Sequence, residues 1–449
     1  MDPGEISSQA EPRGRWHLRW PVGVLGPAPR LREINLACWA MLAAYLLLRI
    51  GVPLWVQFKT GVSSLHILPA DFIYYYGDGR IANEYPLAQF YDYGLQTRIY
   101  NEIYPLQNGV YGMQPYPPFV PLFFSLYARL PFGLAFGAWM ATSLLLYLVG
   151  VGVVARDAFV GEPLKVSLVF CFALAFYPFF VGTLINGQPT AIAVCAVAVS
   201  YGLERRERPY WSGLALSLLA YKPTLCLLLV PMLLVTRRGK QFSGFVGGVF
   251  ALMAVATAMG GAQVWPAYAR YLGVYRRVLS LRDRLGMPLA KHVDIGSCLL
   301  AISGGRSAFV GFAMALIAGA VLIALALLGW KSARFGDAVR RLVWAAAITW
   351  TLLVNAYVPI YDAALAAIAA VLTLGALKEP EWKTAQAWIV FLVVLVEVTS
   401  WFTIGFAAKH GIQLLSIALA LLGVAQLFLL HRRMIRPVAR EPDLCRIPG

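Results

Sequence analysis

The sequence predicts an all-α polytopic membrane protein. Of its 449 residues, 59% are hydrophobic and 13% are charged, whereas soluble domains average about a quarter charged residues. Apolar runs of about 18 residues or more, the length of a bilayer-spanning helix, recur between Ile34 and Leu430. These two observations exclude a water-soluble globular protein.

The distribution of basic residues agrees with this fold class. The chain has 38 Lys and Arg residues against 22 Asp and Glu, a net charge of +16. Short basic clusters stand between the apolar runs, as the positive-inside rule describes for cytoplasmic segments. The clusters are Arg205-Arg206, Arg237-Arg238, Arg340-Arg341 and Arg432-Arg433. We therefore expect the lipid bilayer of the cell membrane, and not a nucleic acid, to be the partner of these charges.

The elements follow in order along the chain. We expect residues 1–33, which are rich in Pro, Gly and Arg, to form a disordered cytoplasmic tail. A transmembrane domain then covers residues 34–430, and residues 431–449 form a basic cytoplasmic tail. The predicted spans are 34–56, 132–155, 166–184, 188–203, 242–263, 307–330, 341–357, 360–377, 385–406 and 412–430.

The segment from Trp211 to Val235 permits two interpretations. It is long enough for one helix, but Lys222-Pro223 interrupts it and basic clusters flank both ends. The positive-inside rule favours two short helices that form a hairpin, with Lys222 near the outer turn. This interpretation gives about 12 crossings with both termini inside the cell, whereas a single helix gives 11.

Two longer segments then lie outside the cytoplasm. Residues 57–118 form the first extracytoplasmic loop, which contains ten of the 22 tyrosines. Residues 264–296 form a second, basic loop with Arg276, Arg277 and His292. Long loops that are not of low complexity usually carry function. We therefore place the active site on this extracytoplasmic face.

The first loop contains the candidate catalytic carboxylate, Asp71. A carboxylate among aromatic residues near a membrane surface can act as a general base, because partial desolvation raises its pKa; capping of a short helix is the alternative. Polar groups that can bind a sugar follow, although tyrosines also form interfacial belts and Asn-Gly suits a tight turn. These candidates are Tyr74, Tyr75, Asp78, Tyr91, Asp92, Tyr116, Asn186 and Gln188.

A second set of residues can bind phosphate. Lys222 interrupts an apolar run, and an ammonium group near hydrocarbon needs a partner such as a lipid phosphate, unless it extends to the interface. Arg276 and Arg277 offer forked donors, and Asp362 follows Tyr361 at the start of a span. The sequence contains no P-loop, dinucleotide-binding or zinc-protease motif. We therefore expect no cofactor and no metal.

The order of these residues resembles the membrane-embedded GT-C glycosyltransferases, most closely glycosyltransferase family 87. The resemblance covers most of residues 35–380. It begins with Asp71-Phe72 before Tyr74-Tyr75, and continues with Leu87 to Asp92. The later matching features are Tyr116-Pro117-Pro118, Gly187-Gln188, Gly213, Lys222-Pro223 and Arg237-Arg238.

The resemblance implies a GT-C-like bundle and an inverting transfer of a hexose, mannose above all, from a polyprenyl-phosphate donor to an extracytoplasmic glycolipid or glycan acceptor. Asp71 matches the catalytic base of such enzymes, which are not thought to need a metal. Some relatives have a histidine where this chain has Tyr361, and His292 is a candidate substitute in binding the donor phosphate. Transfer of arabinose is one alternative, and a lipid or polysaccharide transporter is another.

Overall fold

The protein is entirely helical over the residues that its structure describes. The structure is a computed structural model, and it describes residues 30–52, 71–105, 111–280, 289–302, 307–329, 336–355, 357–378 and 382–435. Within these ranges no strand forms, and a single bridge joins His292 to Pro359. The predicted all-α fold is confirmed. The proposed terminal tails lie mostly outside the described residues, as do residues 57–70 of the first loop.

Five of the described helices are long and apolar enough to cross a membrane. They are α6 (Phe132–Ala158), α11 (Gly239–Gly260), α14 (Ser307–Gly329), α17 (Lys383–His410) and α18 (Leu414–Ile435). A sixth span results if α7 (Pro163–Ala175) and η4 (Pro178–Ile185), which are bent by 57° relative to each other, count as one. The chain is therefore a membrane protein.

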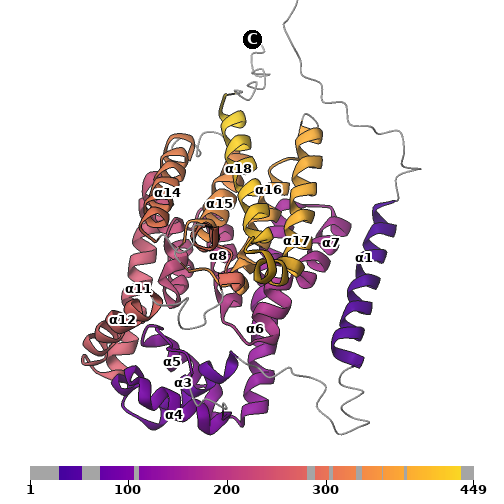
Figure 1. The fold of residues 1–449 in the computed structure, drawn as a ribbon. Coiled ribbons are helices and arrows are strands. Elements are labelled where there is room, and N and C mark those ends of the chain that lie inside the picture. Colours follow the sequence, from indigo (N-terminus) through magenta and orange to yellow (C-terminus); the bar gives the residue numbers. More distant parts are fainter. Residues whose placement is uncertain are drawn as a thin grey trace, which may run out of the picture.

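Shorter helices complete the bundle. Helix α1 (Leu31–Leu46), continued by η1 (Leu47–Gly51), lies at the edge beside α7 (Figure 1). Helix α15 (Gly336–Leu353) lies inside the bundle and is buried from Arg341 to Leu353. The other elements are α8 (Thr190–Arg205), α9 (Pro209–Leu216), η5 (Ser217–Tyr221), η6 (Pro223–Cys226), α10 (Leu229–Val235), α13 (Ile295–Ile302), η9 (Ile360–Leu365) and α16 (Ala366–Gly375).

Small residues let α9 and α11 pack in close contact. A Cβ atom added to Gly213 would lie 1.9 Å from the carbonyl oxygen of Gln241, and one added to Gly244 would lie 2.1 Å from that of Tyr210. Such close approach is typical of helix pairs in membranes, where packing replaces the hydrophobic effect. The buried Gln241 amide donates to Ser212 at 2.6 Å in the same contact.

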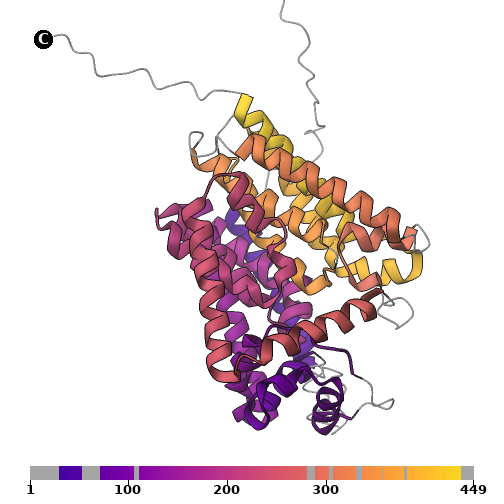
Figure 2. The same cartoon turned by 90° about the vertical axis from the view of Figure 1, so that its left-hand side faces the viewer.

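The two ends of the bundle differ in structure. At one end, here called the loop end, lie α3 (Phe72–Glu84), η2 (Leu87–Tyr91), α4 (Tyr93–Ile103), α5 (Phe119–Ser125) and α12 (Val264–Ser280). In Figure 1 this end is at the bottom, and Figure 2 shows the same separation after a 90° turn. The end of α18 lies opposite, at the top.

The opposite end, here called the basic end, brings together the predicted basic clusters. Arg205 pairs with Asp337, and Arg238 and Arg340 lie near Glu204. Arg433 at the end of α18 donates to the carbonyl of Ala376 at 2.5 Å. The boundaries of α8, α10, α11, α15, α16 and α18 therefore meet at one level, which is the arrangement that the positive-inside rule describes.

The chain reverses direction at Lys222. Arg208, before α9, and Arg238, before α11, both lie at the basic end, and Lys222 stands between η5 and η6. Pro223 has no N–H to continue the helix. The segment from Trp211 to Val235 is thus two short helical arms and not one straight helix.

The structure of residues 264–296 differs from the loop predicted there. Most of its described part is α12, a helix of 17 residues. Val264 and Tyr271 are buried on one side of it, with Tyr268 packed nearby, in a cluster with Leu87 and Phe90. The apolar residues follow helical spacing, but the arginines of this segment make it too polar for a span. A search for spans alone therefore misses it.

A network of ion pairs fixes the basic end. Asp157 on α6 accepts hydrogen bonds from Tyr201 at 2.6 Å, from Arg205 at 3.1 Å and from Arg341 at 3.0 Å. Arg341 also donates to the carbonyls of Asp157 at 3.1 Å and Gly375 at 3.0 Å. The Arg341 side chain, which is 10% exposed, joins α15 to α6 and to the end of α16. The Asp157 carboxylate adds α8 to this network.

We predict that Arg341→Gln lowers the thermal stability of the purified protein much more than Arg340→Gln. Removal of one member of a buried charge pair costs about 3 kcal/mol, whereas Arg340 approaches its carboxylates only at 3.8 and 3.9 Å and should contribute less than about 1 kcal/mol. Thermal unfolding in detergent measures both. Equal melting temperatures for the two variants would show that the network does not stabilise the fold.

Candidate active site

Four segments bring predicted site residues together at the loop end of the bundle. Asp71 directly precedes α3, and Gln188 lies in the turn between η4 and α8. Lys222 stands at the break between η5 and η6, and Tyr361 and Asp362 lie in η9. An added Cβ on Gly182 of η4 would lie 3.0 Å from the Cα of Tyr361, so these two segments pack with their backbones in contact.

The turn Asn186-Gly187-Gln188 sets the position of Gln188. Gly187 has a φ of +76°, and a Cβ added to it would lie 2.6 Å from the Cβ of Phe72. The indole of Trp139 donates to the Gly187 carbonyl at 2.8 Å. Glycine is required here on both grounds. Because the turn packs directly on the first residue of α3, Gln188 lies beside Asp71, while Asn186 is half-buried at the end of η4.

A chain of hydrogen bonds runs through Gln188 to Asp71. The hydroxyls of Tyr75 and Tyr116 are 2.6 Å apart, and Tyr75 donates to Oε1 of Gln188 at 2.6 Å. Since Oε1 accepts this bond, the amide nitrogen of Gln188 is the group that donates to Asp71. Both tyrosine hydroxyls have pKa values raised well above the ordinary value by burial, so they remain neutral donors.

The carboxyl of Asp71 has a raised pKa, mainly because burial disfavours its charge. The hydrogen bond from Gln188 and the positive charge of Lys291 act in the opposite direction and limit this rise. Lys291 itself is exposed, next to the buried His292. A carboxylate in this environment is a stronger base than one in water and stays within reach of solutes.

Lys222 and Asp362 form an ion pair at the break between η5 and η6. The Asp362 side chain is fully buried and also accepts from Thr190 at 3.2 Å, whereas Lys222 is 11% exposed. The ammonium nitrogen lies 4.9 Å from the ring centroid of Tyr361 and 5.8 Å from that of Tyr357. An ammonium has three donors, so this pair still leaves Lys222 able to bind an anion.

His292 reaches the same region from the segment that follows α12. Its ring packs against Tyr357 with centroids 4.7 Å apart, and its neighbour Val293 donates a backbone hydrogen bond to Val358 at 2.9 Å. Asp294 accepts from the N–H of Val358 at 3.2 Å. The segment 289–294 is thus attached along the start of η9.

Other predicted site residues have structural contacts within the loop end. Asp78 is fully buried between α3 and α4, where it accepts from Tyr100 at 2.5 Å, and burial raises its pKa well above the ordinary value. Tyr91 donates to the carbonyl of Tyr116 at 2.9 Å. Asp92 is exposed and caps α4 by accepting from the N–H of Gly94 at 2.8 Å.

Three more candidates lie near the surface of the loop end. The hydroxyl of Tyr74 accepts from the N–H of Gly112 at 3.2 Å, and its ring packs against those of Tyr100 and Tyr111. Arg276 and Arg277 are exposed in the last turns of α12. They give this end a positive surface, while Arg282 and Arg284 of the predicted basic loop lie outside the described residues.

The structure adds site neighbours that the sequence did not single out. Thr190, Lys291 and Tyr357 contact or influence predicted residues from distant parts of the chain. Thr190 follows the Asn-Gly turn by only a few residues, so its position beside the turn was the available signal. No comparable local signal marks Tyr357. Within the described ranges, no group of three or more His, Cys, Asp or Glu residues could hold a metal ion.

Comparison with models of protein families identifies a glycosyltransferase family. The sequence model of glycosyltransferase family 87 matches residues 115–356. This segment includes Tyr116, Gln188, Lys222 and His292, while Asp71 precedes it and Asp362 follows it. No curated protein and no solved structure matches the chain significantly.

We predict that Gly187→Ala destabilises the protein by about 3 kcal/mol, and that Gly161→Ala costs only about half as much. Both glycines have a positive φ, where an L-residue costs about 1–2 kcal/mol. Only at Gly187 would the new methyl group also clash with a neighbour, since nothing lies within 4 Å of a Cβ at Gly161. Thermal unfolding of both variants measures the difference. Equal losses would contradict the close contact between the turn and α3.

Proposed function

The chain belongs to glycosyltransferase family 87, and we propose from this that Asp71 is the general base of an inverting sugar transfer at the loop end of the bundle. Family membership establishes a glycosyltransferase and favours an enzyme over a transporter. The observation that supports the role of Asp71 is the hydrogen-bond chain from Tyr116 through Tyr75 and Gln188. This chain holds a carboxylate of raised pKa within electrostatic range of Tyr361, the neighbour of Asp362.

In the proposed reaction, Asp71 removes the proton from an acceptor hydroxyl. The hydroxyl oxygen forms a bond to the anomeric carbon of the donor sugar, on the side opposite the lipid phosphate. The bond between that carbon and the phosphate oxygen breaks, and the polyprenyl phosphate leaves with the electron pair. The configuration at the anomeric carbon is inverted, and no metal takes part in the proposed steps.

Lys222 is proposed to bind the phosphate of the donor. Its ion pair with Asp362 holds the ammonium group at the helix break, and its remaining donors can stabilise charge on the leaving phosphate. His292 and Tyr361 lie beside Tyr357 and Lys222 and are proposed to complete this phosphate site. The exposed Arg276 and Arg277 would attract an anionic donor toward it.

Asp71 is preferred to Asp78 because the two carboxyl groups have different surroundings. Asp78 is fully enclosed and its acid form is favoured by burial, so it is not accessible to an acceptor. Asp71 is only partly buried in the structure and lies at the start of α3. We place the acceptor among the polar groups between Asp71 and Tyr116, on the extracytoplasmic side of the cell membrane. The GT-C type and a mannosyl donor remain parts of this proposal.

We predict that Asp71→Asn lowers turnover by about 10²- to 10⁴-fold, the usual contribution of a general base. Asp78→Asn should keep turnover within a few-fold, because an amide replaces a protonated acid of the same shape and still accepts from Tyr100. The assay is sugar transfer by the purified proteins in nanodiscs, with polyprenyl-phosphate mannose and arabinose as donors and a membrane extract as acceptor source. Loss of turnover in Asp78→Asn alone, with both variants folded, would contradict the assignment.

We also predict that Lys291→Gln moves the acidic limb of the pH–rate profile to higher pH. The positive charge of Lys291 lowers the pKa of Asp71, so its removal raises that pKa and a higher pH is then needed to deprotonate the base. Plateau turnover should stay nearly unchanged. Lys409→Gln, which removes an exposed charge at the end of α17, is the control. A shift to lower pH, or equal shifts in both variants, would contradict the proposed role.

A further inference from the structure

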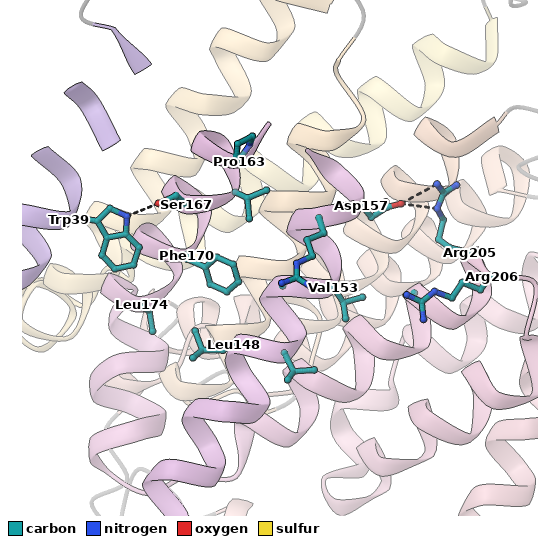
Figure 3. Close-up of a pocket in the computed structure, with 15 residues that line it drawn as sticks. Trp39, Leu148, Val153, Asp157, Pro163, Ser167, Phe170, Leu174, Arg205 and Arg206 are labelled. Atoms are coloured by element: carbon teal, nitrogen blue, oxygen red, sulfur yellow. Dashed lines mark hydrogen bonds and ion pairs between the residues drawn. The ribbon is translucent and has the colours of Figure 1, made fainter. Parts of the chain in front are cut away.

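A cavity of about 1130 Å³ lies between α1, α6, α7 and α8 (Figure 3). Arg205 and Arg206, at the end of α8, lie at one side of it. Trp39 of α1 closes the opposite side and donates to Ser167 at 2.8 Å. The cavity therefore belongs to the basic end of the bundle, and none of the residues assigned to sugar transfer lines it.

The cavity wall changes from apolar to cationic along α6. Leu148, Gly152 and Arg156 line it at intervals of four residues, so they share one face of the helix and extend over roughly 12 Å. On α7 the lining residues Phe170 and Leu174 repeat this apolar spacing. The result is an apolar channel with arginine at its mouth.

The charges at the mouth do not cancel. Three arginines and one aspartate line the cavity, Arg156, Arg205, Arg206 and Asp157, which gives a net charge of +2. Asp157 is engaged by Arg205 and Arg341. Among the described residues, no carboxylate lies within salt-bridge distance of Arg156 or Arg206, and both are exposed.

We propose that this cavity is a binding site for an anionic phospholipid. One acyl chain would lie along Leu148, Val149 and Phe170, and the phosphate would pair with Arg156 and Arg206. Val149 is 42% exposed, so the apolar channel opens on the outer surface of the bundle, where lipid surrounds a membrane protein. Arginine pairs well with phosphate, and each basic residue near an anionic lipid surface contributes about a fivefold gain in affinity.

The test is native mass spectrometry of the full-length protein in detergent with added phosphatidylglycerol, and with phosphatidylcholine as the zwitterionic comparison. The double variant Arg156→Gln/Arg206→Gln should weaken phosphatidylglycerol binding about 30-fold. The matched control, Arg208→Gln/Lys240→Gln, removes the same charge from exposed positions at the same end that do not line the cavity. It should leave binding within about twofold.

A second variant tests the apolar channel separately. Val149→Trp fills the channel without changing the charge and should also abolish phosphatidylglycerol binding. If Val149→Trp does not fold, Gly152→Leu replaces it in the same test. Equal losses of phosphatidylglycerol binding in the two double variants would show general attraction to the basic end and would overturn the site. Full binding in both channel variants, or displacement of phosphatidylglycerol by equimolar polyprenyl phosphate, would also overturn it.

Discussion

The ion pair between Lys222 and Asp362 is the contact on which the arrangement of the candidate active site depends. An ammonium group and a carboxylate within apolar helices are costly unless each has a partner. Their pairing joins residues 140 positions apart in sequence and holds the break at Lys222-Pro223 against η9. Tyr361, beside Asp362, then lies against η4, and the turn after η4 carries Gln188 to Asp71. This one ion pair thus helps to bring together the four segments of the site, which are the start of α3, the turn after η4, the break at Lys222 and η9.

The sequence predicts where the helices are interrupted better than it predicts which distant residues pair at these interruptions. Lys222-Pro223 and Asn186-Gly187 are local signals, because proline ends a helix and glycine permits a positive φ, and the structure has a break or a turn at both. By contrast, the pairing of Lys222 with Asp362 joins distant segments and has no local signature. The burial of Asp78 behind Tyr100 likewise depends on how α3 and α4 pack. The cap formed by Asp92 was within reach of the sequence, since aspartate before a helix commonly accepts from its first N–H groups.

Asp157 at the basic end and Asp71 at the loop end are held in different ways. At the basic end, guanidinium groups and carboxylates pair directly, as Asp157 does with Arg205 and Arg341. At the loop end, Asp71 accepts from the amide side chain of Gln188, which is held in turn by neutral tyrosine hydroxyls, and Lys291 is the cation that influences it. Direct ion pairing would lower the pKa of a carboxylate and weaken it as a base. A network of neutral donors therefore suits proton transfer, whereas full pairing suits a structural role.

Broken helices leave backbone groups without partners, and membrane proteins tolerate this only where other groups replace them. Several polar residues near the site meet that need. Asn355 donates to the carbonyl of Thr224 at 2.8 Å, beside the break at Pro223, and Asp294 accepts from the N–H of Val358. Thr183 donates to the carbonyl of Pro178 at 2.9 Å, at the start of η4.

These contacts divide the polar residues of the site into two groups. Asn355, Asp294 and Thr183 have their side chains committed to interrupted backbone, so they support the site without being available to a substrate. Asp71 and Lys222 are bound instead to other side chains, Gln188 and Asp362, and each keeps hydrogen-bonding capacity beyond that partner. Asp71 and Lys222 can therefore act as proton acceptor and cation for a substrate, because other side chains already supply the hydrogen bonds of the interrupted backbone.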